Sequence, residues 1–160
     1  MKKGVRQFVL NVIGLLALLG IVSAADPNNL VANSQDWKDV YSVVMYGNFM
    51  GISSAFLVSD RHGPLLLNNI PKENNIWLFT SSNAPFIRNY PGIIEADGRT
   101  VEEFQSNNIN LEIAKRLNST KFIILDDSYG YNAISIASYA VVTRSYVLFA
   151  DRRNIGGVLA

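Results

Sequence analysis

Two stretches of the chain nearly repeat each other, and this repeat limits the possible folds more than any other feature. Residues 30–60 and 122–151 each contain an apolar strand-like run followed by a short polar loop with an aromatic residue. A helix-like segment and a second apolar run ending at aspartate complete each copy. Two matching supersecondary units indicate a fold built from repeated strand–helix–strand units.

The offset between the two copies changes along their length. Asp39 aligns with Asn132 at an offset of 93 residues (132 − 39), whereas Asp60 aligns with Asp151 at an offset of 91 (151 − 60). We therefore expect the first copy to carry two extra residues (93 − 91), near positions 48–53.

Apolar periodicity predicts the individual elements. A helix capped by Asp36 is expected to end near Gly47 and Gly51. A T-x-x-E capping box predicts a long helix over residues 100–117, which could break at its two central asparagines. A second helix is expected over residues 131–142, and a short one over 84–87. Strands are expected over residues 30–32, 55–58, 76–79, 93–96, 122–125 and 146–150.

The alternation of strands and helices predicts an α/β fold with a mostly parallel sheet flanked by helices. We expect a first α/β repeat over residues 26–118 and the start of a second over residues 119–160. The second unit is incomplete, because it lacks counterparts of the 76–79 and 93–96 strands and of the long helix.

The first 25 residues have the pattern of a signal peptide. Basic residues at positions 2, 3 and 6 precede an apolar run over residues 8–22, and a small-x-small cleavage site follows at 22–24. The run is shorter than the roughly 20 residues of a membrane-spanning helix, although an uncleaved anchor is the alternative. We expect export to the cell surface or envelope. Asn118, in the N-S-T sequon, is then a glycosylation site or, alternatively, the end of a helix.

Charge and motif content argue against several classes of function. The formal net charge of +1 gives no electrostatic case for nucleic-acid binding, and the absence of cysteine excludes a thiolate metal site. Phosphate-loop, dinucleotide and nucleophile-elbow motifs are missing. His62 near Asp60 is a general-base candidate but fits a surface turn better, and Asp97, Asp126 and Asp127 fit solvated or capping roles better than a metal site. We predict no catalytic residue, metal or cofactor.

Polar and aromatic residues follow the first strand of each copy. Ligand sites in open α/β sheets lie at the carboxyl ends of the strands, where this chain carries Trp37, Asp39, Tyr131 and Asn132. Aromatic rings beside Asn and Asp suit glycan contact by stacking and hydrogen bonding. Alternatively, the rings pack on the sheet edge and the polar groups bond backbone at the helix starts.

The first copy carries WKDVYS at 37–42 and the second carries YNAIS at 131–135. This pattern resembles the type 2 cell-wall-binding repeat family. Between them, ADGRT at 96–100 is similar to the family's Gly-x-x-Arg-x-x-Thr segment, with a compressed Arg–Thr spacing. Asn132 replaces the family's aspartate in the second copy.

The resemblance implies a non-enzymatic cell-surface protein, a cell-wall or envelope-polymer-binding or surface-layer module. Its partner would be an anionic polymer, and other copies of the chain in a surface layer are a further possibility. The polymer-binding residues would be Trp37, Asp39, Arg99, Tyr131 and Asn132. Any anion site must be local, with candidate cations Lys38, Arg61, Arg99, Arg144, Arg152 and Arg153. The alternative is an exported α/β domain that binds a small solute or saccharide.

Overall fold

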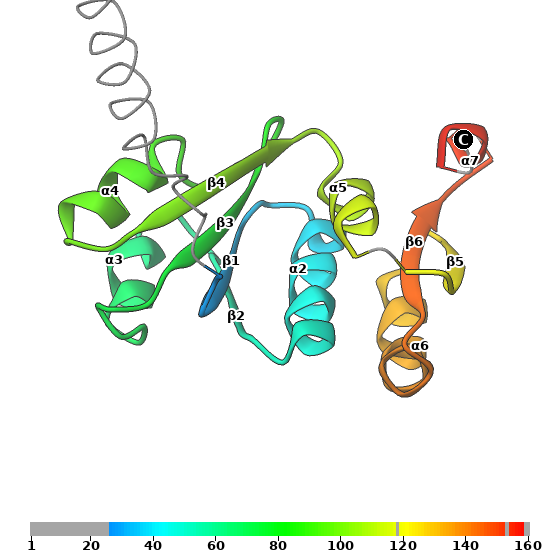
Figure 1. Ribbon diagram of the computed structural model, residues 1–160. Helices are drawn as coiled ribbons and strands as arrows, with labels where there is room; N and C mark the ends of the chain where they lie inside the picture. The colour runs from blue at the N-terminus through cyan, green and yellow to red at the C-terminus, as the bar shows by residue number, and fades with distance from the viewer. Residues whose placement is uncertain (1–25, 118, 153, 159–160) are drawn as a thin grey trace, which may run out of the picture.

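The computed structural model describes residues 26–117, 119–152 and 154–158 (Figure 1). The expected signal peptide and Asn118 therefore lie outside the described residues. The strands are β1 (Asn29–Asn33), β2 (Ser53–Phe56), β3 (Ile76–Ser81), β4 (Val101–Ser106), β5 (Phe122–Asp126) and β6 (Tyr146–Ala150). The helices are α2 (Trp37–Met50), α3 (His62–Leu67), α4 (Tyr90–Ala96), α5 (Ile109–Arg116), α6 (Gly130–Thr143) and α7 (Ile155–Val158). None of the helices in these ranges is long and apolar enough to cross a bilayer.

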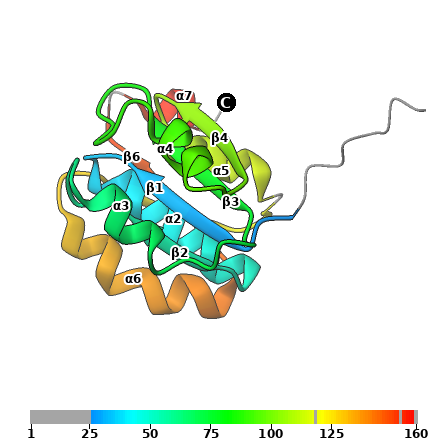
Figure 2. The same ribbon diagram turned by 90° about the vertical axis from the view of Figure 1, so that its left-hand side faces the viewer.

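The strands form two parallel sheets, which confirms the predicted α/β fold. The larger sheet has the order β2-β1-β3-β4, and β5 pairs with β6 in a separate sheet. Helices α3 and α4 cover one face of the larger sheet, while α2 and α5 lie on the other face, between that sheet and the β5–β6 unit (Figure 1). Helix α6 lies beside α2 along one side of the molecule (Figure 2).

The predicted start and end of α2 are confirmed. The Asp36 carboxylate accepts a hydrogen bond from the Lys38 backbone N–H at 2.9 Å, which satisfies one of the free donors at the helix start. The helix ends at Gly51, whose φ of 66° lies in the left-handed region that glycine adopts without a Cβ penalty.

The repeat is more regular than the sequence suggested. Strands β1 and β5, helices α2 and α6, and strands β2 and β6 all begin 93 residues apart (122 − 29, 130 − 37, 146 − 53). Both helices have 14 residues, and both end at a residue in the left-handed region, Gly51 and Arg144. The expected two-residue insertion near positions 48–53 was wrong, because the offset of 93 is unchanged across this segment, and helices α3 and α7 also begin 93 residues apart (155 − 62). Asp60 and Asp151 therefore do not mark equivalent ends.

Residues 93–96, expected as a strand, form the end of helix α4. Tyr90 and Ile94, one helical turn apart, are the residues that α4 buries, and Pro91 occupies its first turn. The short helix expected over residues 84–87 was also wrong, since this segment has no helical structure. A proline does occupy the first turn of a helix, but it is Pro91 of α4 and not Pro85, the proline within the predicted 84–87 helix.

The long helix expected over residues 100–117 is instead strand β4 followed by helix α5. Tertiary pairing overrides the capping-box pattern, because β4 pairs with β3 and Glu103 accepts a hydrogen bond from the Thr80 hydroxyl at 2.6 Å. The break falls at the central asparagines. Asn108 caps α5 by accepting a hydrogen bond from the Leu111 backbone N–H.

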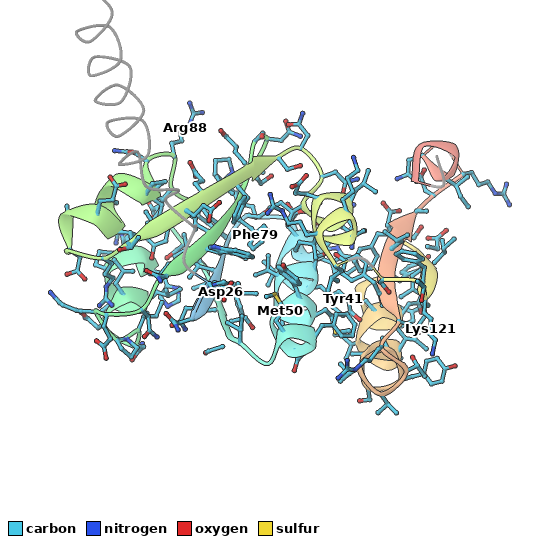
Figure 3. All side chains as sticks on the ribbon, viewed as in Figure 1. Asp26, Tyr41, Met50, Phe79, Arg88 and Lys121 are labelled. Atoms are coloured by element: carbon cyan, nitrogen blue, oxygen red, sulfur yellow. The ribbon has the colours of Figure 1, made fainter. Side chains whose placement is uncertain are left out.

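The two units share a core. Tyr146 and Leu148 of β6 belong to the same buried cluster as Leu30 and Phe79 of the larger sheet. Figure 3 shows Phe79 between that sheet and α2, and Tyr41 on the side of α2 toward the second unit. Alternate residues of β6 pack against α6 instead. The second unit therefore depends on α2 and α5 for much of its burial.

Candidate functional site

The carboxyl ends of strands from both units meet at one edge of the molecule. Residues that follow β1, β4, β5 and β6 line a small cleft of about 110 Å³ there. Its lining is mostly polar and consists of Asp36, Lys38, Asp39, Asn107, Asn108, Asn110, Asp127, Phe149 and Asn154. This is the position at which open α/β sheets bind ligands.

Aromatic side chains gather beside this cleft. The Trp37 ring, 39% exposed, meets the Phe149 ring edge-on with centroids 5.1 Å apart. A Cβ on Gly130 would lie 3.7 Å from the Trp37 ring, so the start of α6 passes closely under it. On either side of this glycine, the Tyr129 and Tyr131 rings stack with centroids 5.5 Å apart. We call Trp37, Lys38, Asp127, Tyr129 and Tyr131 the strand-end site.

Lys38 joins the two units electrostatically at the strand-end site. Its ammonium lies 3.1 Å from the Asp127 carboxylate and 3.6 Å from that of Asp36. Burial of the Lys38 ammonium lowers its pKa. The hydrogen bond to Asp127 and the two nearby carboxylates outweigh this effect, so that the pKa of Lys38 is raised. The ammonium is therefore fully charged at neutral pH and already paired.

Asp39 lies beneath the cleft and is 8% exposed. Its carboxylate accepts a hydrogen bond from the Ser34 hydroxyl at 2.7 Å. Burial raises the pKa of Asp39, the Ser34 hydrogen bond partly offsets this, and the nearby Asp36 carboxylate adds to it. Asp39 therefore orders the loop between β1 and α2.

Tyr131 and Asn132 lie in the first turn of α6. Tyr131 is exposed, with 64% of its surface accessible, and it contacts Tyr129. Asn132 is half-buried and donates its backbone N–H to the Tyr129 carbonyl. The start of α6 therefore carries Tyr131 and Asn132 directly after Gly130, whose backbone lies against the Trp37 ring.

Arg99 lies apart from the strand-end site, in the segment that joins α4 to β4. It is 7% exposed, and its guanidinium donates to the carbonyls of Leu67, Ile70 and Pro71 at 2.6–2.7 Å. Its Nε also donates to the Asp97 carboxylate at 2.7 Å. The Arg99 side chain thus fixes the chain that leaves α3, and we leave it out of the candidate polymer-binding set.

Asn110 is the residue of this region that the sequence did not reveal. Its side-chain amide donates to the Val147 carbonyl at 2.8 Å and accepts from the Phe149 N–H at 3.1 Å. The amide thereby pairs with the outer edge of β6 as a neighbouring strand would. It also donates to the Ser42 hydroxyl at 2.9 Å. An asparagine in the second half of the helix predicted over residues 100–117 carries no signal for such a long-range role.

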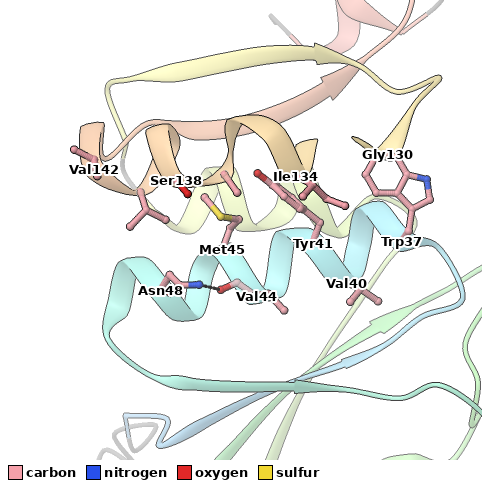
Figure 4. Close-up of a pocket in the computed structure, with 12 residues that line it drawn as sticks. Trp37, Val40, Tyr41, Val44, Met45, Asn48, Gly130, Ile134, Ser138 and Val142 are labelled. Carbon is pink, nitrogen blue, oxygen red and sulfur yellow. Dashed lines mark hydrogen bonds between the residues drawn. The ribbon is translucent and has the colours of Figure 1, made fainter. Parts of the chain in front are cut away.

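A larger groove begins at Trp37 and Gly130 and runs between α2 and α6 (Figure 4). Its volume is about 720 Å³, and most of its lining is apolar. Ile134 and Val142 on its α6 side are highly exposed, at 75% and 83%. The groove therefore offers apolar contact area next to the strand-end site.

The residues considered for catalysis and metal binding have separate surroundings. His62 begins α3, and its buried Nδ1 has no hydrogen-bond partner among the described residues. Asp97 pairs with Arg99, whereas Asp127 pairs with Lys38. Within the described ranges, no group of three or more His, Cys, Asp or Glu residues is arranged to hold a metal ion.

Comparison of the chain with protein-family models, curated proteins and solved structures finds no match. Functional inference therefore depends on the site itself.

Proposed function

We propose that this chain is a non-enzymatic cell-surface protein that binds an envelope polymer at the strand-end site. The observation that carries the proposal is the grouping of three exposed aromatic residues, Trp37, Tyr129 and Tyr131, beside a polar cleft at the carboxyl ends of the strands. Flat rings stack on the apolar faces of sugars, and carboxylates and amides exchange hydrogen bonds with their hydroxyl groups.

The charges at the strand-end site favour the uncharged, hydroxyl-rich part of such a polymer. Among the described residues that line the cleft, Asp36, Asp39 and Asp127 face one ammonium, that of Lys38, which is already paired. An anionic group placed here would meet more negative than positive charge. The anionic groups expected of the polymer would then contact the protein elsewhere.

Two further observations support a surface location and a polymeric partner. The leader-like first 25 residues indicate export, and the repeated motifs resemble those of cell-wall-binding repeats. The exposed apolar residues Ile134 and Val142 also suit contact with other copies of the chain in a surface layer.

Binding of a small solute is the second candidate function. The groove between α2 and α6 favours it, because its volume of about 720 Å³ lies within the range of small-molecule sites and its lining is apolar. A solute site would saturate with one small molecule per chain, whereas polymer binding requires an extended ligand.

The test is sedimentation of the protein with purified cell envelopes. Replacing Tyr129 and Tyr131 together by alanine should weaken the affinity for envelopes roughly 30-fold, since stacking on a sugar contributes about 1 kcal/mol per ring. Tyr139→Ala is the matched control, because Tyr139 is as exposed as Tyr129 at 59% and lies two helical turns further along α6. Equal binding by all variants would refute the proposed site, and failure of the folded wild-type protein to sediment with envelopes would refute the proposed function.

A further inference from the structure

A second cleft lies at the opposite end of the second unit, where β5 and β6 begin. Its volume is about 430 Å³. Lys121 directly precedes β5 and Arg144 directly follows α6, and the Lys121 carbonyl accepts a hydrogen bond from the Tyr146 N–H at 2.8 Å. The cleft is lined by Phe49, Leu117, Ser119, Thr120, Lys121 and Arg144, and we call it the basic cleft.

The basic cleft carries uncompensated positive charge. Lys121 and Arg144 are exposed, and neither side chain takes part in the ion pairs formed among the described residues. The described residues that line the cleft include no carboxylate. Two cations that share a cleft without an acidic partner create a local positive potential, which the net charge of +1 does not reveal.

The backbone of Arg144 gives an independent reason to regard this side chain as functional. Arg144 has a φ of 52°, and it is the one non-glycine residue with positive φ among those described. The equivalent residue of the first unit, 93 positions earlier, is Gly51, which adopts the same conformation with a φ of 66°. An arginine costs about 1 kcal/mol more than glycine in this conformation. Such local strain is concentrated at functional sites.

We propose that the basic cleft binds an oxyanion, a phosphate or carboxylate group carried by a saccharide. The guanidinium and ammonium groups supply charge-assisted hydrogen bonds to the anion. Thr120 adds a hydroxyl to the lining, while Phe49 and Leu117 provide the apolar surface that a sugar ring needs. A volume of about 430 Å³ accommodates a sugar together with its anionic group.

This site is separate from the strand-end site and does not depend on the function proposed for it. The strand-end site holds several carboxylates and favours hydroxyl groups, whereas the basic cleft favours anions. If both proposals hold, one polymer chain would contact the two sites through different chemical groups. If the protein binds no anion, the proposal for the basic cleft is refuted. The proposal for the strand-end site is not affected, because the tyrosine variants test it separately.

The test is titration of the full chain with inorganic phosphate, with binding monitored by calorimetry or by NMR chemical shifts. Arg144→Gly is the decisive variant, because it introduces the residue type found at the equivalent position of the first unit, Gly51, and removes the backbone strain. It should therefore fold at least as stably as the wild type and bind phosphate at least tenfold more weakly. Lys121→Ala should weaken phosphate binding to a similar degree. Arg88→Ala is the control, since Figure 3 shows Arg88 and Lys121 at opposite sides of the molecule.

Two further ligands separate a free anion from one attached to a sugar. Glucose 1-phosphate should bind more tightly than inorganic phosphate if the apolar wall contacts a sugar ring, and glucuronate tests the carboxylate. Tighter binding of either sugar-borne anion than of phosphate supports the proposal. Phosphate binding that is unchanged in Arg144→Gly, or lost equally in Arg88→Ala, would overturn it, as would the absence of anion binding to the wild type.

Discussion

The two units share their local structure but differ in their surroundings. Each has a strand, a 14-residue helix and a second parallel strand at a constant offset of 93 residues. Strand β1 lies inside its sheet, between β2 and β3, whereas β5 pairs with β6 alone among the described strands. Val31 on β1 is fully buried, but Ile124 at the equivalent position of β5 is 44% exposed. Local sequence thus specifies the supersecondary unit, and tertiary neighbours decide how far it is buried.

Contacts with the first unit compensate for the limited burial of strands within the second unit. A two-stranded sheet is marginal by itself, but the outer edge of β6 pairs with the Asn110 amide, and Tyr146 and Leu148 enter the core of the larger sheet. The junction that stabilises the second unit also brings the strand ends of both units together. Stability and the candidate site therefore depend on the same contacts.

The largest expected effect on the free energy of unfolding is that of Asn110→Ala, which removes the pairing of the Asn110 amide with β6. The buried N–H of Phe149 and carbonyl of Val147 would lose their partner, at roughly 1–3 kcal/mol each. We expect the free energy of unfolding to fall by about 3 kcal/mol in urea denaturation. Asn107→Ala, at an exposed position in the preceding loop, should change it by less than about 0.5 kcal/mol. If the two variants are equally stable, the amide does not hold the units together.

We expect a smaller effect on the free energy of unfolding from alanine substitutions at equivalent positions of β1 and β5. Val31→Ala removes fully buried methyl groups and should cost about 2 kcal/mol of unfolding free energy. Ile124→Ala removes a larger side chain but should cost less than about 1 kcal/mol, because almost half of Ile124 is exposed. Thermal or urea unfolding of both variants measures the difference. A greater loss from Ile124→Ala would mean that β5 is covered in solution, for example by another copy of the chain.

The smallest effect concerns Asp39, whose equivalent in the second unit is Asn132. Burial raises the pKa of Asp39 above its ordinary value of 3.8, although the Ser34 hydrogen bond acts in the opposite direction. Well below pH 3.8 the carboxyl is protonated in both the folded and the unfolded chain. As the pH rises, the unfolded chain ionises first, so the folded state loses stability until its own carboxyl has ionised.

Asp39→Asn should therefore be more stable than the wild type at pH 7, and this advantage should disappear near pH 3. Urea unfolding of both proteins across this range measures the difference in free energy. An advantage that grows as the pH falls would show that the ionised carboxylate stabilises the fold, contrary to the direction of the pKa shift.

The sequence was sufficient to predict the α/β class, the repeat and the boundaries of α2 and α6, because these depend on local patterns. The apolar spacing along α2, its Asp36 cap and Gly51 all act within a few residues of the chain. By contrast, residues 101–106 form a strand only because β3 provides an edge on which they pair. Their local pattern resembles a helix start, and no short-range signal opposes that interpretation.

The candidate site was predicted in part. Trp37 and Tyr131 follow strand ends, and the topology brings those ends together at Gly130. The burial of Arg99 depends on carbonyl groups some 30 residues earlier in the chain, which no local motif specifies. The role of Asn110 likewise depends on β6, 37–39 residues later.

The most direct test of polymer binding at the strand-end site uses the fluorescence of Trp37. The chain has two tryptophans, so Trp77→Phe leaves Trp37 as the sole indole. Titration of this variant with soluble envelope polysaccharide should change the Trp37 emission with saturation, in parallel with binding measured by sedimentation. Polysaccharide that binds the protein but leaves the Trp37 emission unchanged would contradict the account, because the polymer would then occupy a different surface.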